Sequence, residues 1–408
     1  MKIQRFPFLY IYKHKSDNEI YFAIDRLVQG KCTGGIRVRE GIEPKELLDN
    51  ALLMSKKMAV ANLPCGGAKL GLNLKNPKEK RSVLTDFGNR ISSLLSKNIF
   101  IPGMDMQSNI EDVKTLLGSY AGSFYRLDNN IDSSFYTAFG VYTYLKIFKR
   151  KFFSYVDTLS CGMEGCGKVG TSLLKILRRD NRFKVSFISD ETGTYSISGK
   201  DTIERILNEK ENDVWKKLSE ILPEPLGLSS EVKYSDVDIL IPGATQNFIM
   251  PEDVGKLKIK AIIPNSNLPY HPDSISLLKE RHIKFIPEYF PNTGGVFGSM
   301  LGNIGFDPFY TSYIINKHFN LIFDYVLKEA GRPENFYETG ERLINEKLNT
   351  PFWKGGMEEK FITQYVSKLS NYFNYFPKNI RRRFVTTWYL PYSAMWSWNK
   401  KDINQFKL

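Results

Sequence analysis

Two lysines and one aspartate near the start of this chain could form a proton-transfer site. Lys57 and Lys69 flank the glycine-containing segment LPCGGA, and Asp105 follows a short apolar stretch and Gly103. In a cleft, one ammonium could pair with a substrate carboxylate, while the other, desolvated beside it, would have a lowered pKa and accept protons. Asp105 could be the complementary acid or base. The spacing also fits two solvated lysines beside a glycine turn, which is the commoner arrangement.

A glycine fingerprint indicates a second site, for a dinucleotide. The segment GCGKVG fits GxGxxG, follows an apolar strand and opens a helix, and a second strand ends at Asp190. Glycines let the backbone approach a pyrophosphate at the helix N-terminus, and the acid accepts the ribose hydroxyls. Asp190 therefore favours NAD, although Arg178, Arg179 and Arg182 leave NADP open; a tight turn without a ligand is the alternative. The fingerprint residues are Gly165, Gly167, Lys168, Val169 and Gly170.

The elements that must position these residues change in character near residue 137. Before it, apolar spacing predicts strands at 6–12, 20–25 and 98–102, helices at 43–60 and 83–97, and a glycine-rich turn at 63–72. After it, a helix, a strand, glycines, a helix and a strand form a βαβ unit, which requires a parallel sheet. This sheet is expected to continue through 237–244, 259–267 and 283–290, with a helical excursion at 201–230.

We therefore expect an α/β protein of two domains. Residues 1–136 would form an α/β substrate domain, residues 137–300 a doubly wound Rossmann-type nucleotide domain, and residues 301–408 a helical region. The catalytic cleft is expected between the two domains.

Composition excludes several classes of protein. The 408 residues are 42% hydrophobic and 25% charged, which is typical of globular domains and not of disordered or fibrous chains. No apolar run approaches the roughly 18 residues of a membrane-spanning helix, and the first apolar run reads as a strand and not a signal peptide. The net charge of +13 arises mostly from scattered basic residues. Four cysteines without a CxxC pair and four histidines predict neither a disulfide framework nor a metal site, and favour a reducing cytoplasm.

Taken together, the motifs resemble the glutamate/leucine/phenylalanine/valine dehydrogenase family, over about residues 7–305. The segments that carry the resemblance are GGIR (34–37), MSKK (54–57), LPCGGAKLG (63–71), IPGMDM (101–106), TAFGV (137–141), GCGKVG (165–170), DILIPGA (238–244), NSN (265–267) and NTGGV (292–296). The short N-terminus looks more like the leucine and phenylalanine branch. The resemblance implies oxidative deamination of an L-amino acid with NAD, NADP not excluded, by a homo-oligomer whose C-terminal helices return to the first domain.

The resemblance also implies roles for single residues. Lys57 matches the lysine that holds the substrate α-carboxylate, Lys69 the low-pKa lysine that activates water, and Asp105 the aspartate that moves protons to and from nitrogen. Thr137, Asn267 and the fingerprint turn match cofactor contacts. Positions around the substrate are matched by Gly35, Val296 and Ser299.

Departures from the family pattern bear on the substrate. Thr33 stands where glutamate-specific members usually carry lysine, Ser299 is a hydroxyl where the leucine enzyme is apolar, and Gly103 leaves room for a bulky side chain. We therefore expect a large or partly polar side chain, and not glutamate. Residues 107–108 and 265–266 also depart from the pattern, which raises a second hypothesis: a catalytically degenerate homologue that binds NAD or an amino acid as a sensor or scaffold.

The C-terminal tail, residues 371–408, mixes seven basic residues with aromatic ones. A helical extension packed on the first domain or on a neighbouring subunit is favoured, and binding of nucleic acid or a membrane surface is the alternative.

Overall fold

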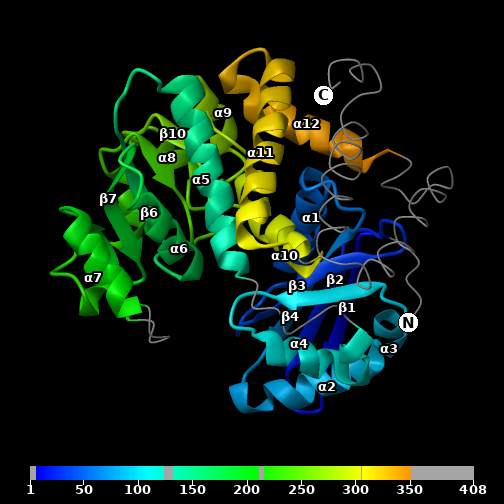
Figure 1. Ribbon diagram of the computed structural model, residues 1–408. Coiled ribbons are helices and arrows are strands. Elements are labelled where there is room, and N and C mark those ends of the chain that lie inside the picture. The colour runs from blue at the N-terminus through cyan, green and yellow to red at the C-terminus, as the bar shows by residue number, and fades with distance from the viewer. Residues whose placement is uncertain (1–5, 124–131, 211–215, 305, 351–408) are drawn as a thin grey trace. The chain divides into compact units, whose positions relative to one another are not determined.

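The computed structural model describes residues 6–123, 132–210, 216–304 and 306–350 (Figure 1), so the tail at 371–408 lies outside the described residues. The chain divides into two compact units. The first contains residues 1–130, 303–306 and 344–408, and the second contains residues 131–302 and 307–343. Both units hold helices and strands, and the expected helical region 301–408 is shared between them.

The first unit is built on a mixed sheet with the strand order β1-β2-β4-β3-β5 in the described residues. β1 and β2 form an antiparallel hairpin, β2 pairs antiparallel with β4, and β3 pairs in parallel with both β4 and β5. The strands are β1 (Phe8–Lys13), β2 (Glu19–Ile24), β3 (Cys32–Val38), β4 (Gly66–Asn73) and β5 (Phe100–Met104), and the α-helices α1 (Pro44–Val60), α2 (Lys80–Arg90), α3 (Ser92–Ser96) and α4 (Ile110–Leu117).

Alternation along the strands sends apolar side chains to two different cores. Ala68, Leu70 and Leu72 of β4 face α2, α3 and α4 in the larger core, because successive side chains point to opposite faces. On the other face, α1 packs over β2 and β4 in a smaller core that contains Leu47 and Ala51 (Figure 1). Residues 67, 69 and 71 therefore lie on the α1 face of the sheet.

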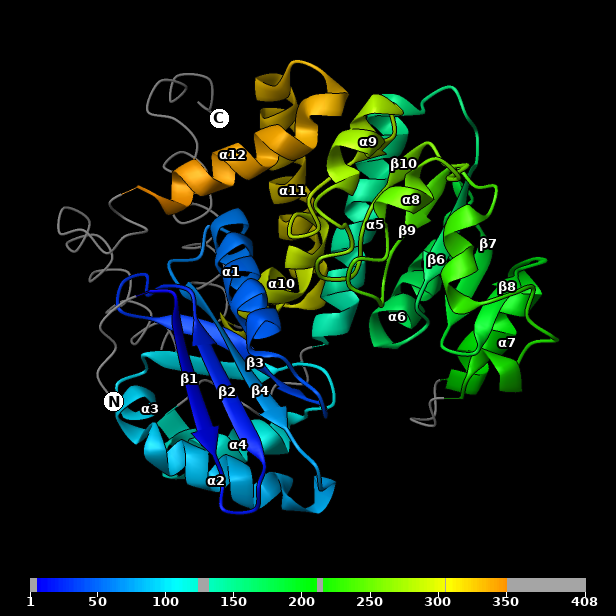
Figure 2. The same ribbon diagram turned by 180° about the vertical axis from the view of Figure 1, so that it is seen from behind.

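The second unit is a doubly wound sheet with the strand order β11-β10-β9-β6-β7-β8. All pairs are parallel except β7 with β8. α5 lies in front of the sheet in Figure 1, and α8 and α9 come to the front in Figure 2. The strands are β6 (Leu159–Glu164), β7 (Phe183–Asp190), β8 (Gly193–Ser196), β9 (Ile239–Ile241), β10 (Ala261–Ile262) and β11 (Lys284–Phe285), and the helices α5 (Ser133–Phe152), α6 (Lys168–Leu177), α7 (Lys200–Lys210), α8 (Pro251–Val254), α9 (Ser274–Glu280), α10 (Gly294–Ile304) and α11 (Pro308–Ala330).

The last described helix, α12 (Phe336–Leu348), begins in the second unit and ends in the first. The buried Lys347 ammonium donates a hydrogen bond of 2.7 Å to the carbonyl of Ala59, at the C-terminal end of α1. Arg26 donates to the carbonyl of Leu348 at 2.8 Å. The described end of the chain is thus held on the first unit.

Several elements differ from the expectations. The segment 63–72 is mostly strand β4 and not a turn, because its glycines allow close backbone packing instead of reversing the chain. The expected helix 83–97 is two helices, α2 and α3, and among the described residues of the excursion at 201–230 helix is confined to α7 and short 3-10 turns. The antiparallel strand β8 was not expected. None of the described helices is both long and apolar enough to cross a membrane.

Candidate functional site

The α1 face of the first sheet brings two cations and one carboxylate to the same level. Ile36 of β3 pairs with Leu70 of β4 and with Met104 of β5. The residues adjacent to these three, Arg37, Lys69 and Asp105, therefore lie side by side on adjacent strands. Lys69 and Arg37 are buried, and Asp105 is partly open, with 22% of its side chain exposed.

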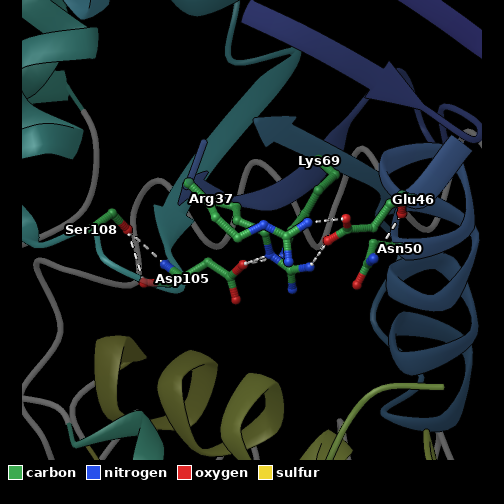
Figure 3. Close-up of polar contacts among 7 residues, drawn as sticks. Arg37, Glu46, Asn50, Lys69, Asp105 and Ser108 are labelled. Atoms are coloured by element: carbon green, nitrogen blue, oxygen red, sulfur yellow. Dashed lines mark hydrogen bonds and ion pairs between the residues drawn. The ribbon is translucent and has the colours of Figure 1, made fainter. Parts of the chain in front are cut away.

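One carboxylate oxygen receives both cations. Lys69 Nζ lies 2.6 Å from Asp105 Oδ2, and Arg37 Nε lies 2.9 Å from the same oxygen (Figure 3). Arg37 also forms an ion pair through Nη1 with Glu46 in the first turn of α1, and Arg39 contacts the other oxygen of Glu46 at 2.6 Å. The catalytic residues predicted from the resemblance, Lys69 and Asp105, are thus in direct contact.

These contacts set the charges of the pair. Burial lowers the pKa of Lys69, and Arg37 lowers it further, against the opposing attraction of Asp105. Burial alone would raise the pKa of Asp105, but Lys69 and Arg37 hold it well below its usual range. Asp105 is therefore ionised while both cations face it, and Lys69 can lose its proton more readily than a solvated lysine.

Small residues of β3 and β5 lie beside the pair of Lys69 and Asp105. Gly35 pairs with Gly103 across β3 and β5. A methyl group on Gly35 would lie 2.6 Å from Asp105 Cβ, so only glycine lets Asp105 approach this closely, whereas a methyl group on Gly103 would meet nothing within 4 Å. The hydroxyl of Thr33 donates to the backbone carbonyl of Ile101 at 2.8 Å, so it is anchored to β5.

The turn after Asp105 fixes its backbone. The amide of Asp105 donates to Ser108 Oγ at 2.8 Å, and that hydroxyl donates back to the carbonyl of Asp105 at 3.1 Å. Gln107 adopts a left-handed conformation, with φ of 56°. The departure from the family pattern at 107–108 therefore still forms a closed turn that holds Asp105.

The remaining predicted substrate residues are distributed over both units. Lys57 is buried in the last turn of α1, whose Ser55 hydroxyl accepts a 2.8 Å hydrogen bond from the amide of Gly67, at the beginning of β4. Val296 and Ser299 lie partly exposed on α10 of the second unit. The roles of these three residues stay predictions.

In the second unit, the fingerprint turn has the backbone that a pyrophosphate cradle requires. Gly165 adopts φ of 90°, in the left-handed region. A methyl group on Gly170, the third residue of α6, would lie 2.2 Å from the carbonyl oxygen of Gly165, so the first turn of the helix packs on the fingerprint turn only with glycine at this position. Gly167 and Lys168 are exposed at the N-terminus of α6, nothing lies within 4 Å of a methyl group on Gly167, and Val169 is half-buried. This open helix end fits an anion.

A buried glutamate ties this turn to the neighbouring strand end. The carboxylate of Glu164 accepts hydrogen bonds of 3.0–3.2 Å from the amides of Gly243, Ala244 and Thr245. These three residues follow β9, so Glu164 holds the carboxyl ends of β6 and β9 together.

The other predicted cofactor residues are joined to the NTGGV segment. Asn292 donates to Asn267 Oδ1 and to the carbonyl of Ser266, both at 3.1 Å. A methyl group on Gly295 would lie 2.2 Å from the hydroxyl oxygen of Thr137, so α10 packs directly on α5 here. Asn267 therefore follows β10 at the same carboxyl edge of the sheet as the fingerprint turn, where ligands of doubly wound sheets bind.

Asp190 lies at the end of β7 as expected, but its carboxylate already has partners. Its oxygens accept hydrogen bonds from the amide of Thr192 at 2.9 Å and from the amide of Leu218 at 2.7 Å. The ribose contact and the exclusion of a 2′-phosphate both stay predictions.

Sequence reasoning missed four residues that organise the two sites: Arg37, Glu46, Glu164 and Asn292. Arg37 stands two residues after Gly35, and this spacing would have placed both on one face had residues 32–38 been interpreted as a strand. Glu164 adjoins a segment already singled out and Asn292 is the first residue of another, but their backbone partners are distant in sequence. Glu46 has no local signal beyond its place in a first helical turn. The described residues contain no group of three histidine, cysteine or acidic side chains placed to hold a metal ion.

Comparison with known proteins gives one consistent result. Residues 132–304 match the family described as glutamate/leucine/phenylalanine/valine dehydrogenase, and residues 16–122 match its dimerisation domain. The NADP-specific glutamate dehydrogenase of Saccharolobus shibatae is 26% identical over 347 residues, which cover 79% of this chain and 74% of that protein.

Two solved structures share the fold. The hetero-hexameric glutamate dehydrogenase of Thermus thermophilus gives a TM-score of 0.68 at 17% identity, over 83% of this chain and 87% of its own. The L-tryptophan dehydrogenase of Nostoc punctiforme gives 0.58 at 22% identity, over 84% and 95%. The two-unit α/β architecture expected from the sequence is thereby confirmed.

Proposed function

Because this chain belongs to the glutamate/leucine/phenylalanine/valine dehydrogenase family, we propose that it catalyses the reversible oxidative deamination of an L-amino acid to a 2-oxo acid and ammonia. The observation that carries this proposal is the contact of 2.6 Å between the buried Lys69 and Asp105. Removing hydride from a substrate Cα gives an iminium, which water must attack before ammonia leaves. That sequence requires a base and a carboxylate held together out of water.

Each residue at the sheet face has one proposed task. Lys57 pairs with the substrate α-carboxylate and so fixes Cα. Lys69, whose pKa is lowered by burial and by Arg37, takes a proton from the attacking water once it has given up its own. Asp105 stabilises the cationic nitrogen and then moves protons to and from it. Figure 3 shows its second oxygen turned away from both cations, which leaves that oxygen for the substrate nitrogen.

The second unit is proposed to bind the nicotinamide dinucleotide. The residues present fit this group, because the exposed helix end at Gly167 and Lys168 and the close packing of Gly165 and Gly170 form a cradle for a pyrophosphate. A bound nicotinamide supplies the hydride acceptor for the substrate Cα. Thr137 and Asn267 are proposed to hold it, and the charge of Asp190 supports NAD over the NADP used by the Saccharolobus relative.

The substrate is proposed to carry a large or partly polar side chain. Thr33 offers no cation for a side-chain carboxylate, and its hydroxyl is bound to the backbone of β5. The open space above Gly103 accommodates bulk next to Asp105. We further propose a homo-oligomer in the cytoplasm, since residues 16–122 match a dimerisation domain and the four cysteines are free.

The test is a screen of the common L-amino acids and their 2-oxo acids plus ammonia, with NAD and NADP, followed by absorbance of the reduced cofactor. We expect turnover with one or a few large substrates and more than about 1,000-fold loss in Lys69→Ala, from loss of the base and of its positioning. Lys75→Ala is the matched control, because this lysine is exposed and its ion-pair partner among the described residues is the exposed Asp17.

Two outcomes would contradict the proposal. Equal rates in Lys69→Ala and the wild type would exclude the base. Thermal stabilisation by NAD or an amino acid without turnover by the wild type would indicate the sensor or scaffold instead.

A further inference from the structure

A chain of alternating charges runs from solvent to the catalytic pair. Arg39, with 43% of its side chain exposed, contacts Glu46; Glu46 contacts the buried Arg37; and Arg37 contacts Asp105, which also holds Lys69. Neither Arg37 nor Glu46 is among the residues predicted for the substrate or the cofactor. Their burial nevertheless places two more charges within one side chain of the proposed chemistry.

Arg37 is the only side chain in this chain of charges that bridges two carboxylates. Its Nε donates to Asp105 at 2.9 Å, while Nη1 forms the ion pair with Glu46. A guanidinium can do this because its donors lie in one rigid plane, whereas an ammonium is a single point of charge on a flexible stem. The plane of Arg37 therefore fixes the orientation of the Asp105 carboxylate. With Oδ2 taken by Arg37 and Lys69, the other oxygen is directed away from both (Figure 3).

We propose that Arg37 and Glu46 are positioning residues for the deamination: Arg37 orients the carboxylate of Asp105, and Glu46 holds Arg37 in the plane that this requires. This inference rests on the proposed function. Glu46 is itself anchored in the first turn of α1, where Asn50 Nδ2 donates to the backbone carbonyl of Glu46 at 2.7 Å. The helix that carries Lys57 and the strand that carries Arg37 are thus coupled through one carboxylate.

The same two residues act on Lys69 with opposite signs. The charge of Arg37 lowers the pKa of Lys69, and the charge of Glu46 raises it. The other charged groups beside these residues are Asp105, which contacts Arg37, and Arg39, which contacts Glu46. Beyond the turn at 105–108 lies the ion pair of Lys80 with Asp112. None of these is changed by substituting Arg37 or Glu46. Removal of each charge should therefore move the titration of Lys69 in a direction that can be stated in advance.

The experiment compares Arg37→Gln, Arg37→Lys, Glu46→Gln and the matched control Arg39→Gln in the full-length protein. Arg39 binds the same carboxylate as Arg37 but does not touch Asp105. For Arg37→Gln we expect kcat to fall by about 30-fold or more with little change in the KM for cofactor, and Arg37→Lys should not restore it. Arg39→Gln should stay within about 3-fold of the wild type.

The pH dependence separates positioning from a merely structural role. The acid limb of kcat/KM should move to higher pH in Arg37→Gln and to lower pH in Glu46→Gln, each by about one pH unit. The pKa of Lys69 itself is measured independently, from the rate of its acetylation by acetic anhydride against pH, followed by mass spectrometry. The two variants should shift this titration in the same opposite directions.

The labelling measurement needs no turnover, so it distinguishes failure of this inference from failure of the proposed function. If the wild type is inactive on every substrate but Lys69 still titrates as described, the proposed function fails and the electrostatic role of Arg37 and Glu46 stands. Equal shifts of the same sign in both variants, or full rescue of kcat by Arg37→Lys, would overturn the inference. If Arg37→Gln does not fold, the direction of the shift in Glu46→Gln decides.

Discussion

Gly35 and Gly103 are paired neighbours whose substitution by alanine should have opposite results. A methyl group on Gly35 would lie 2.6 Å from Asp105 Cβ and 2.8 Å from the carbonyl oxygen of Met104. Neither atom belongs to a flexible side-chain end, so β3 and β5 must separate, and ordinary contact at about 3.5 Å requires a displacement of roughly 0.9 Å. Gly103, directly opposite, has open space where the methyl group would go.

The size of this displacement sets the expected loss of stability and the expected loss of catalytic rate. Overpacking of this kind costs about 1–3 kcal/mol, which for a unit of this size lowers Tm by about 3–10 °C. A shift approaching 1 Å in a catalytic group costs about 100-fold in rate, so kcat/KM of Gly35→Ala should fall by that order. Gly103→Ala should keep or slightly raise Tm, since alanine restricts the unfolded chain, and its kinetic effect should grow with the size of the substrate side chain.

The test is to measure Tm by calorimetry and kcat/KM by steady-state kinetics for the two variants. Wild-type Tm and kcat/KM in Gly35→Ala would refute the reasoning. So would a loss of stability in Gly103→Ala as large as that in Gly35→Ala, because the two positions differ only in what the methyl group meets.

Three further predictions concern residues outside that pair. In Gly170→Ala, the new methyl group meets a carbonyl oxygen at 2.2 Å, so Tm and the thermal shift produced by NAD should both fall, whereas Gly167→Ala should keep the wild-type Tm; unchanged stabilisation by NAD in Gly170→Ala would contradict this. Glu164→Gln places an amide against backbone donors, so calorimetric titration should show NAD affinity lowered about 10-fold and stability lowered by about 1–3 kcal/mol; wild-type affinity would remove Glu164 from the cofactor site. Burial lowers the pKa of Lys347 to about 7, below its value in the unfolded chain. Above pH 7 the unfolded state therefore binds more protons than the folded state. The free energy of unfolding of the wild type should then rise with pH, by up to about 1.4 kcal/mol per pH unit from this group. Denaturant melts at pH 7, 8 and 9 should show that gain relative to Lys347→Met, and parallel curves would count against it.

Periodicity predicted the elements whose burial follows one simple pattern. Helix 43–60 carries apolar residues at helical spacing, and α1 runs from Pro44 to Val60. The strand, glycine turn, helix and strand from 157 to 190 correspond to β6, α6 and β7 within two residues. The expected strands at 259–267 and 283–290 shrink to two residues each in β10 and β11, since their apolar runs continue as buried irregular chain.

Glycine misled the interpretation of the catalytic strand. In β4 the glycines let helix α1 pack closely on the strand. A methyl group on Gly67 would lie 2.0 Å from the carbonyl oxygen of Ala51, so this close packing requires a residue without a side chain. Sequence alone does not distinguish this use of glycine from a turn. The prediction that Lys69 and Asp105 act together was drawn from the resemblance to a family. Local spacing does not show their proximity, because it depends on the parallel pairing that joins β4, β3 and β5 in the fold.

The return of α12 to the first unit has a consequence for synthesis of the chain. The bonds from Lys347 to Ala59 and from Arg26 to Leu348 join residues separated by roughly 300 positions. A nascent chain exposes Ala59 and Arg26 to the cell long before their partners leave the ribosome. The unit made first is therefore finished last, and a fragment that stops before α12 would leave the end of α1 without its cap.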